Sequence, residues 1–286
     1  MSLYEKNIHS EITKVDVPTM QIRWWNANMY EFKFPDGTKV LFDPFLPNKE
    51  EKPNWAHYDC GFYPKDVDKV DYVVINHTHG DHVGYLKEIY DMYQPVILCH
   101  NAAAYRLCKD LDIPFTSVIP FQYDQTLDFG SFKMTTHPCR HTGGGRKPSE
   151  GGPDMGTNLE ILNEYGSLFN TNFVFTTTNN FRIGFVAGRY DANERNAIIP
   201  EELNVMIRQC GTTIRTGKAE LLADEFMSTG ASILFPLHHE QCYAAADLNA
   251  FVAQENEILA QRGYPGRMIF PQRTKWYNLT VGAALS

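Results

Sequence analysis

The chain has 286 residues, of which 43% are hydrophobic, and this supplies enough apolar material for a sizeable core. Its 34 acidic and 26 basic side chains give a formal net charge of −8, so the basic excess typical of nucleic-acid-binding proteins is missing. No run of about 18 apolar residues is present, which argues against a membrane span. We expect one domain over residues 1–286, with no membrane partner and with nucleic acid disfavoured.

The cysteines point to a reducing environment. They are scattered, and no two of them form a C-x-x-C pair. The first residues of the chain lack the apolar segment of a signal peptide. We therefore expect a cytoplasmic protein with six free thiols, which are Cys60, Cys99, Cys108, Cys139, Cys210 and Cys242.

The N-terminal part of the chain predicts strands. Residues 1–18 are polar and patternless, and we expect them to form a loose lead-in. Two β-rich runs follow, at 20–34 and 38–46, and the turn Pro35-Asp36-Gly37 between them predicts a hairpin. The second run ends at Asp43-Pro44, which places a carboxylate where a strand stops.

The middle of the chain mixes strands with helices. Short apolar runs alternate with stretches of helical spacing. In order, we expect a strand at 72–75, a helix at 86–94, a strand at 95–100, a helix at 102–113, and strands at 114–121 and 131–141.

The last part of the chain begins with a glycine-rich loop at residues 142–158, and a loop of this length is usually functional or disordered. The pair Asn179-Asn180 then divides two β-rich runs and predicts a second hairpin. In order, we expect a helix at 221–230, a strand at 232–239, a helix at 247–263 and a closing strand pair at 267–281.

A dense group of metal-binding side chains follows the predicted strand at 72–75. The run reads His77-Thr78-His79-Gly80-Asp81-His82, with three imidazoles and one carboxylate. His77 and His79 are two residues apart, so in an extended chain they point the same way and can share one metal ion. Asp81 and His82 are adjacent, so we expect them to diverge and to serve a second ion or the rim of the first. The run predicts a metal site.

More ligands are expected at the ends of later strands, because one ion needs three or four protein ligands. His141, Asp191 and His238 each follow a β-rich run and could gather at one edge of a sandwich. Each has an alternative taken alone: a histidine at a strand end is more often structural, and Asp191 could cap a helix. The preceding run of ligands favours the metal-binding interpretation for all three.

Two neighbouring histidines compete with these candidates. We prefer His141 to His137, because His137 lies before Pro138 and not where the strand gives way to the loop. Between His238 and His239 the choice is left open, since only one of two adjacent side chains can point inward from an extended chain. The remaining histidines are expected to be structural or to lie on the surface, and they are His9, His57 and His100.

The run from His77 to His82 matches the H-x-H-x-D-H signature of the metallo-β-lactamase superfamily, and the chain resembles this superfamily from about Met20 to its end. The segment at Asp43-Pro44 looks like that of the branch of metal-dependent hydrolases that includes L-ascorbate-6-phosphate lactonase. Three later segments are also similar to family motifs: Pro138–His141, Gly188–Asp191 and Phe235–His238.

This resemblance implies an α/β protein with a four-layer αββα sandwich, the metallo-β-lactamase fold. It also implies two divalent ions at one sheet edge, with zinc as the first expectation and manganese as the second. Asp43 would orient a ligand. Carried over by position, one ion would be held by His77, His79 and His141, the other by Asp81, His82 and His238, and Asp191 would bridge them.

The sequence departs from the family pattern at two places. A small G-H-A turn is usual near the N-terminus, and Trp25-Asn26-Ala27-Asn28 stands there instead. Two extra residues, Arg189-Tyr190, precede Asp191.

The activity implied is hydrolysis by a hydroxide that the metal ions generate from water, with Asp81 as a catalytic residue that can also accept a proton. Arg140, Arg146 and Lys147 surround His141 and could neutralise a phosphate or carboxylate, although a solvated charged loop is an equal alternative. We expect a small anionic ester, lactone or phosphate-bearing substrate. The alternatives are a phosphodiesterase or nuclease of the same superfamily and a non-enzymatic metal-binding protein. Homo-oligomerisation is left open.

Overall fold

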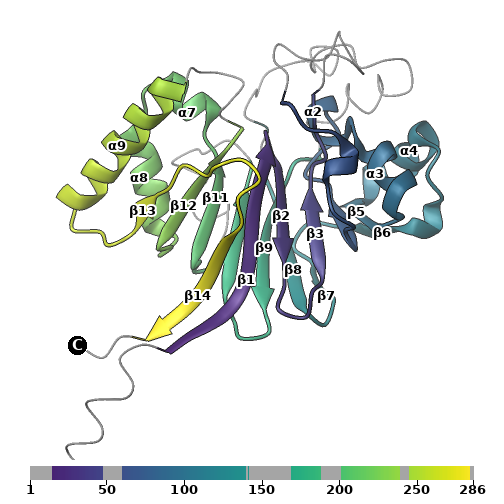
Figure 1. The fold of residues 1–286 in the computed structure, drawn as a ribbon, viewed down its shortest axis with the longest axis horizontal. Helices are drawn as coiled ribbons and strands as arrows, with labels where there is room; N and C mark the ends of the chain where they lie inside the picture. The colour runs from purple at the N-terminus through teal and green to yellow at the C-terminus, as the bar shows by residue number, and fades with distance from the viewer. Residues whose placement is uncertain are drawn as a thin grey trace, which may run out of the picture.

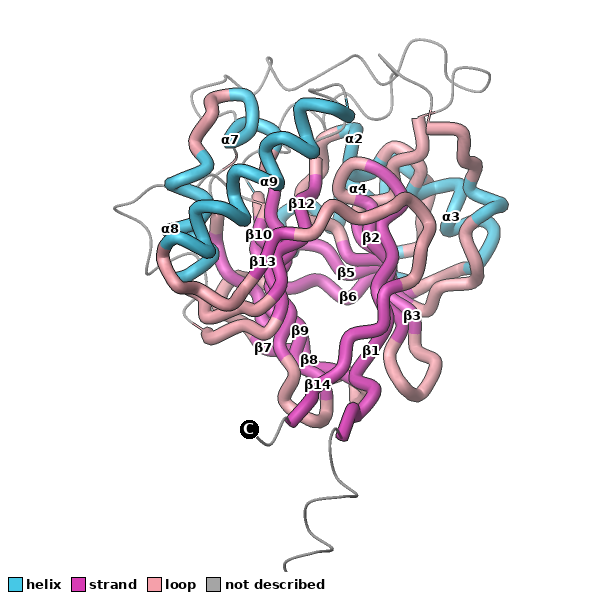
Figure 2. Tube along the Cα trace, turned by 60° about the vertical axis from the view of Figure 1, so that its left-hand side comes forward, coloured by secondary structure: helices cyan, strands magenta, loops and turns pink. Residues whose placement is uncertain are grey.

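The computed structural model describes residues 15–47, 60–139, 141, 169–187, 201–238 and 245–283. Two seven-stranded sheets face each other in the middle of the molecule, and helices cover both outer faces (Figure 1). The turned view in Figure 2 shows the same layers, with strands enclosed between two groups of helices. The expected four-layer αββα sandwich is confirmed.

The first sheet combines the N-terminal part of the chain with its last strand. Its order is β14 (Tyr277–Ala283), β1 (Val15–Asn26), β2 (Met29–Lys33), β3 (Lys39–Phe42), β4 (Tyr72–Val74), β5 (Val96–His100) and β6 (Val118–Phe121). Strands β14 to β3 pair antiparallel, whereas β3 to β6 pair parallel. The parallel strands therefore all end at one edge of the sheet.

The second sheet repeats this mixed pattern. Its order is β13 (Arg267–Met268), β12 (Ile233–Leu237), β11 (Val205–Gln209), β10 (Arg182–Val186), β9 (Thr171–Thr177), β8 (Phe132–Pro138) and β7 (Thr126–Asp128). Strands β10 to β13 pair parallel and β7 to β10 antiparallel.

Helices connect the parallel strands on the two outer faces. The first sheet carries the 3₁₀ turns η1 (Pro64–Asp66) and η2 (Phe115–Ser117) and the helices α2 (Gly80–Val83), α3 (Leu86–Tyr93) and α4 (Asn101–Leu111). The second sheet carries α7 (Gly211–Arg215), α8 (Ala219–Ser228) and α9 (Ala245–Gln261). Among the described residues, no helix is both long and apolar enough to cross a membrane.

Alternating side chains of the strands build three apolar clusters, one for each interface between the four layers. In β3, Val40 and Phe42 belong to the cluster between the two sheets, while Leu41 packs with residues of α3 and α4. A third cluster lies between the second sheet and helices α7 to α9. Strands buried on both faces read as continuous hydrophobic runs, which explains the sequence pattern of β3 to β5.

Aromatic rings dominate the interface between the sheets. Phe42 of the first sheet stacks on Phe185 of the second, with ring centroids 4.4 Å apart and an interplanar angle of 9°. Phe34 stacks on Phe132 in the same way, at 4.6 Å. These contacts fix one sheet against the other, and with it the strand ends that carry the candidate ligands.

The structure corrects the expected N-terminal elements. Strand β1 begins at Val15, so the loose lead-in over residues 1–18 is wrong at its last four positions. The run at 20–34 is not one strand, because the chain reverses at Ala27 and Asn28 to form the β1–β2 hairpin. Neither residue is a glycine or proline, and Ala27 adopts a φ of 45°, so the asparagines Asn26 and Asn28 were the turn signal present at this reversal.

The expected strand pair at 267–281 is wrong. Its two halves are β13 and β14, which lie in different sheets: β13 pairs with β12, and β14 pairs with β1. The predicted hairpins at Pro35–Gly37 and Asn179-Asn180 are confirmed. The five cysteines among the described residues are free, as expected, while Cys242 lies outside them.

Candidate metal centre

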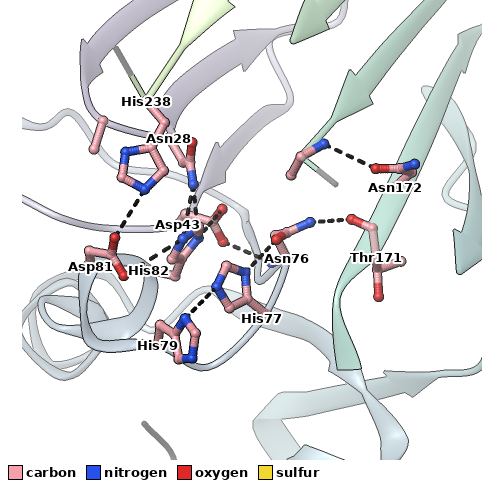
Figure 3. Close-up of polar contacts among 12 residues, drawn as sticks. Asn28, Asp43, Asn76, His77, His79, Asp81, His82, Thr171, Asn172 and His238 are labelled. Carbon is pink, nitrogen blue, oxygen red and sulfur yellow. Dashed lines mark hydrogen bonds and ion pairs between the residues drawn. The ribbon is translucent and has the colours of Figure 1, made fainter. Parts of the chain in front are cut away.

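The described candidate ligands lie at one edge of the sandwich, where strands of both sheets end. Asp43 follows β3, His77 follows β4, His141 follows β8, and His238 follows β12. Ligand sites of α/β proteins commonly form at such carboxyl ends of strands. Figure 3 shows Asp43, His77 and His238 at one region.

The local structure of the motif differs from the extended chain that we expected. Strand β4 ends at Val74, and His79 is the N-cap of helix α2, which begins at Gly80. Asp81 and His82 therefore lie on the first turn of a helix. Their side chains do not diverge to separate places but group with His238, because a helical turn and not a strand carries them.

The first cluster consists of His77, His79 and His141. Each histidine contributes one ring nitrogen, and these three nitrogens lie within 4.8 Å of one another. Nε2 of His77 and Nδ1 of His79 are 3.0 Å apart. The ring of His141 lies 4.9 Å from that of His77 and 4.6 Å from that of His79, measured between centroids.

The second cluster consists of Asp81, His82 and His238, whose donor atoms also lie within 4.8 Å of one another. Oδ2 of Asp81 is 3.0 Å from Nε2 of His238, and Oδ1 is 3.8 Å from Nε2 of His82. The ring centroids of His82 and His77 are only 3.7 Å apart, so the two clusters are neighbours.

Two further polar residues hold the histidine rings. Asp43 is fully buried, and its Oδ2 lies 2.8 Å from Nδ1 of His82. Oδ1 of Asn76 lies 2.5 Å from Nδ1 of His77, while Nδ2 of Asn76 donates to the carbonyl of Thr171 in the other sheet. With Nδ1 engaged, each ring presents Nε2 to its cluster. Sequence reasoning missed Asn76, although it directly precedes the motif.

Asn28 is the second residue that sequence reasoning missed. Its Nδ2 lies 3.1 Å from Nδ1 and 3.0 Å from Nε2 of His82 (Figure 3). The departure from the family pattern at Trp25–Asn28 was the available signal, but it did not indicate a contact with the site.

The protonation states suit metal binding. Burial holds the pKa of His77 well below its ordinary value, and the nearby His82 and His79 lower it further. Burial and the neighbouring His79 lower the pKa of His141 to about 3. Burial alone would raise the pKa of Asp81, but His82 and His238 outweigh it and hold the pKa well below its usual range. Neutral imidazoles and an ionised carboxylate are the forms that bind metals, so the pKa shifts of His77, His141 and Asp81 suit divalent ions.

The sequence comparisons agree with the motif. The sequence model of the β-lactamase superfamily domain matches residues 38–164, which include Asp43 and the whole run from His77 to His82. A protein of Haloquadratum walsbyi named as a metal-dependent hydrolase is 29% identical over 132 residues, or 44% of this chain and 46% of that protein. The matched regions span less than half the length of the curated relatives.

Solved structures share the fold over almost the whole chain. Igni18, a metallo hydrolase from Ignicoccus hospitalis, has a TM-score of 0.59 and 15% identity, covering 93% of this chain and 99% of that one. The isothiocyanate hydrolase from Delia radicum gut bacteria has a TM-score of 0.64 and 14% identity, covering 91% and 99%. The chain thus has the metallo-β-lactamase fold, and its residues 38–164 match the β-lactamase superfamily domain.

Three of the eight described non-glycine residues with positive φ lie at this site. Ala27, Asp43 and His238 have φ angles of 45°, 42° and 55°. Residues other than glycine adopt positive φ only where their surroundings compensate the cost, and such residues cluster at functional sites. All three are at or beside the second cluster.

The remaining candidates fall into two groups. His137 does not join the site: its Nε2 lies 3.0 Å from a carboxylate oxygen of Glu201. His100 ends β5, and its ring packs on those of Tyr123 and Phe169. The candidates outside the described residues are Asp191, Arg140, Arg146, Lys147, His239, His9 and His57.

Proposed function

We propose that this protein is a metal-dependent hydrolase that uses two divalent ions. The observation that carries the proposal is the pair of adjacent three-residue clusters, each with donor atoms within 4.8 Å of one another. The lowered pKa values of His77, His141 and Asp81 favour the neutral imidazoles and the ionised carboxylate that bind cations. The metal-dependent hydrolase name of the Haloquadratum walsbyi relative supports the same assignment.

Imidazole and carboxylate donors without thiolates suit zinc and manganese, and we propose zinc first and manganese second. When bound, two such ions activate a water molecule and stabilise the negative charge that develops on the substrate oxygen. We propose His77, His79 and His141 for one ion and Asp81, His82 and His238 for the other, with Asp191 between them.

Asp81 is the residue that we assign to proton transfer. Its Oδ2 faces Nε2 of His238 at 3.0 Å, whereas Oδ1 is 3.8 Å from His82, beyond hydrogen-bond distance. Oδ1 is therefore the atom proposed to accept a proton during hydrolysis. The side chain of Asp81 is 27% exposed, so a substrate can approach it.

This exposure also argues against a purely structural metal site. Structural sites are closed by protein ligands, whereas catalytic sites keep one position open. The side chain of His238 is 12% exposed, and with Asp81 it forms the accessible side of the second cluster. An enzymatic role is therefore favoured over non-enzymatic metal binding.

For the substrate we propose a small anionic ester, lactone or phosphate-bearing molecule, as in the lactonase-like branch that Asp43-Pro44 resembles. Arg140, Arg146 and Lys147 are proposed to neutralise its charge. A phosphodiesterase or nuclease activity is the alternative, and the formal net charge of −8 disfavours a nucleic-acid substrate.

Metal analysis followed by a hydrolysis screen tests this proposal. Purified protein is assayed against lactones, phosphodiesters and thioesters, with and without a chelator. We expect metal-dependent hydrolysis of a lactone or phosphorylated ester, and its loss in His79→Ala. His137→Ala is the matched control and should keep both metal and activity. A protein that binds no divalent ion and hydrolyses no member of the screen would contradict the proposal.

A further inference from the structure

We propose that the turn Trp25–Asn28 positions the histidines of the second cluster, and that Asn28 controls how tightly this cluster alone binds its ion. The inference rests on the proposed function, because it presupposes that both clusters bind metal. It concerns a segment where the chain departs from the family pattern. Asn28 is therefore a positioning residue, not a ligand.

The contact of Asn28 with His82 leaves the ligand nitrogen available. Nδ2 of Asn28 lies 3.1 Å from Nδ1 and 3.0 Å from Nε2 of the ring. An atom nearly equidistant from both nitrogens cannot lie along the lone pair of either, so the amide nitrogen rests against the face of the ring. Nδ1 already faces Asp43 at 2.8 Å. Asn28 and Asp43 thus fix the tilt of the ring while Nε2 stays directed to the cluster.

The same turn also contacts the other histidine of this cluster. The carbonyl of Ala27 accepts a hydrogen bond from the backbone N–H of His238, at 3.2 Å. His238 has a φ of 55°, so its backbone needs support to stay in this conformation. Among the described residues, Ala27 and Asn28 contact histidines of the second cluster and none of the first.

The turn is held from the far end of the chain. Nη2 of Arg273, which precedes β14, donates to Oδ1 of Asn26 at 3.1 Å. The guanidinium carbon of Arg273 lies 5.4 Å from the centre of a Trp24 ring, and Nε1 of Trp24 donates to the carbonyl of Ala27 at 3.1 Å. Arg273 therefore stabilises the turn without touching either cluster.

The placement of Asn28 is costly for stability, which favours a role in the site. The residue is fully buried, and its Oδ1 has no hydrogen-bond partner among the residues that the structure describes. A buried amide oxygen without a partner lowers the stability of the fold. Packing alone does not explain an asparagine here, whereas a contact that orients His82 does.

Titration of metal-free protein with cobalt(II) tests the inference, because absorption and calorimetry report each ion without an activity assay. We expect wild-type protein to bind two equivalents. Asn28→Ala should weaken the second equivalent about 10–100-fold and alter its absorption band, with the first equivalent unchanged. Asn76→Ala should show the opposite pattern, because Asn76 orients His77 of the first cluster.

Two further variants separate positioning from general destabilisation. Arg273→Ala should also weaken the second equivalent selectively, and it tests the turn if Asn28→Ala does not fold. Asn256→Ala is the control: it removes two hydrogen bonds to the backbone of Met268, remote from the clusters, and should leave both affinities unchanged.

The outcomes distinguish this inference from the proposed function. The inference alone would be overturned if wild-type protein binds two ions while both Asn28→Ala and Arg273→Ala bind the second ion within about twofold of the wild-type affinity. Equal weakening of both ions would overturn it as well. A wild-type protein that binds no ion at the clusters would overturn both.

Discussion

Oδ2 of Asp43 lies 2.8 Å from Nδ1 of His82, and this contact joins the end of β3 to the metal-binding motif after β4. The other oxygen of Asp43 accepts the backbone N–H of Asn76 at 2.8 Å. Burial raises the pKa of Asp43, although the charge of His82 and its hydrogen bond oppose this. One buried carboxyl group thus fixes both the backbone before the motif and a ring within it.

Replacing Asp43 by asparagine tests this relationship. Asp43→Asn keeps the side-chain shape, and asparagine tolerates the positive φ of this position, but the stronger acceptor for His82 is lost. We expect the second ion to bind about 10–100-fold more weakly, with little change for the first. Calorimetric titration measures both affinities. Unchanged binding of the second ion would mean that Asp43 does not orient His82.

The metal-free protein should lose stability in acid. The pKa of His141 is lowered to about 3, and that of His77 is also well below its ordinary value of 6.5. The fold therefore binds fewer protons than the unfolded chain below about pH 6.5, and stability falls as the pH drops, by about 1.4 kcal/mol per pH unit for each group. Asp81, with its lowered pKa, acts in the same direction below its ordinary value of 3.8.

Urea unfolding of metal-free protein between about pH 4 and pH 8 measures this dependence. His141→Ala removes one contributing imidazole and should flatten the profile. A wild-type profile that is level between about pH 6.5 and pH 4 would contradict the assignment of neutral, buried imidazoles.

Glu255 should make the protein less stable as the pH rises, which is opposite to the effect of the buried histidines. It is fully buried in α9, and within the described part of the chain neither carboxyl oxygen has a hydrogen-bond partner. Burial raises its pKa to about 8, with Arg262 opposing and Glu220 adding to the shift. Since the fold then keeps a proton that the unfolded chain releases above its ordinary pKa of 4.5, stability falls as the pH rises from 4.5 to about 8.

Glu255→Gln should remove this contribution, because the amide stays neutral throughout. The variant is expected to gain stability over wild type by up to about 1.4 kcal/mol for each pH unit within the window. Glu257→Gln on the exposed side of the same helix is the control. Parallel stability profiles of Glu255→Gln and wild type would show that the carboxyl group is already ionised in the fold.

The aromatic packing between the sheets predicts that Phe42→Ala strongly lowers the free energy of unfolding. Phe42 is fully buried and stacks on Phe185 across the two sheets. Its removal should lower the free energy of unfolding by about 3–5 kcal/mol. Phe115→Ala, at a side chain that is 53% exposed, should change it by less than about 0.5 kcal/mol. Similar losses in the two variants would contradict the packing described for the sheet interface.

Local sequence patterns predicted where several candidate ligands lie, because these residues follow strands. His141 was preferred to His137 on its position where strand gives way to loop, and the structure groups His141 with His77 and His79 while His137 pairs with Glu201. The same reasoning placed His238 at the end of β12. Strands that run in the same direction end at the same edge of a sheet, so the residues that follow them can be predicted to lie together before their contacts are known.

Contacts between segments far apart in the chain could not be predicted from local sequence patterns. The partners of β13 and β14 lie in different sheets, and nothing in the run 267–281 indicates which strand each will join. Asn28 reaches His82 only because β1 and β2 reverse at a turn without glycine or proline. The divergence expected of Asp81 and His82 was wrong because α2 begins at Gly80, inside the motif.

The metal content of His79→Ala tests the central claim, which is that the two clusters are metal sites that support hydrolysis. Elemental analysis is carried out on wild-type, His79→Ala and His137→Ala proteins, together with the hydrolysis screen. We expect about two ions per wild-type chain, about one in His79→Ala with loss of activity, and no change in His137→Ala. Undiminished metal content and activity in His79→Ala would contradict the account.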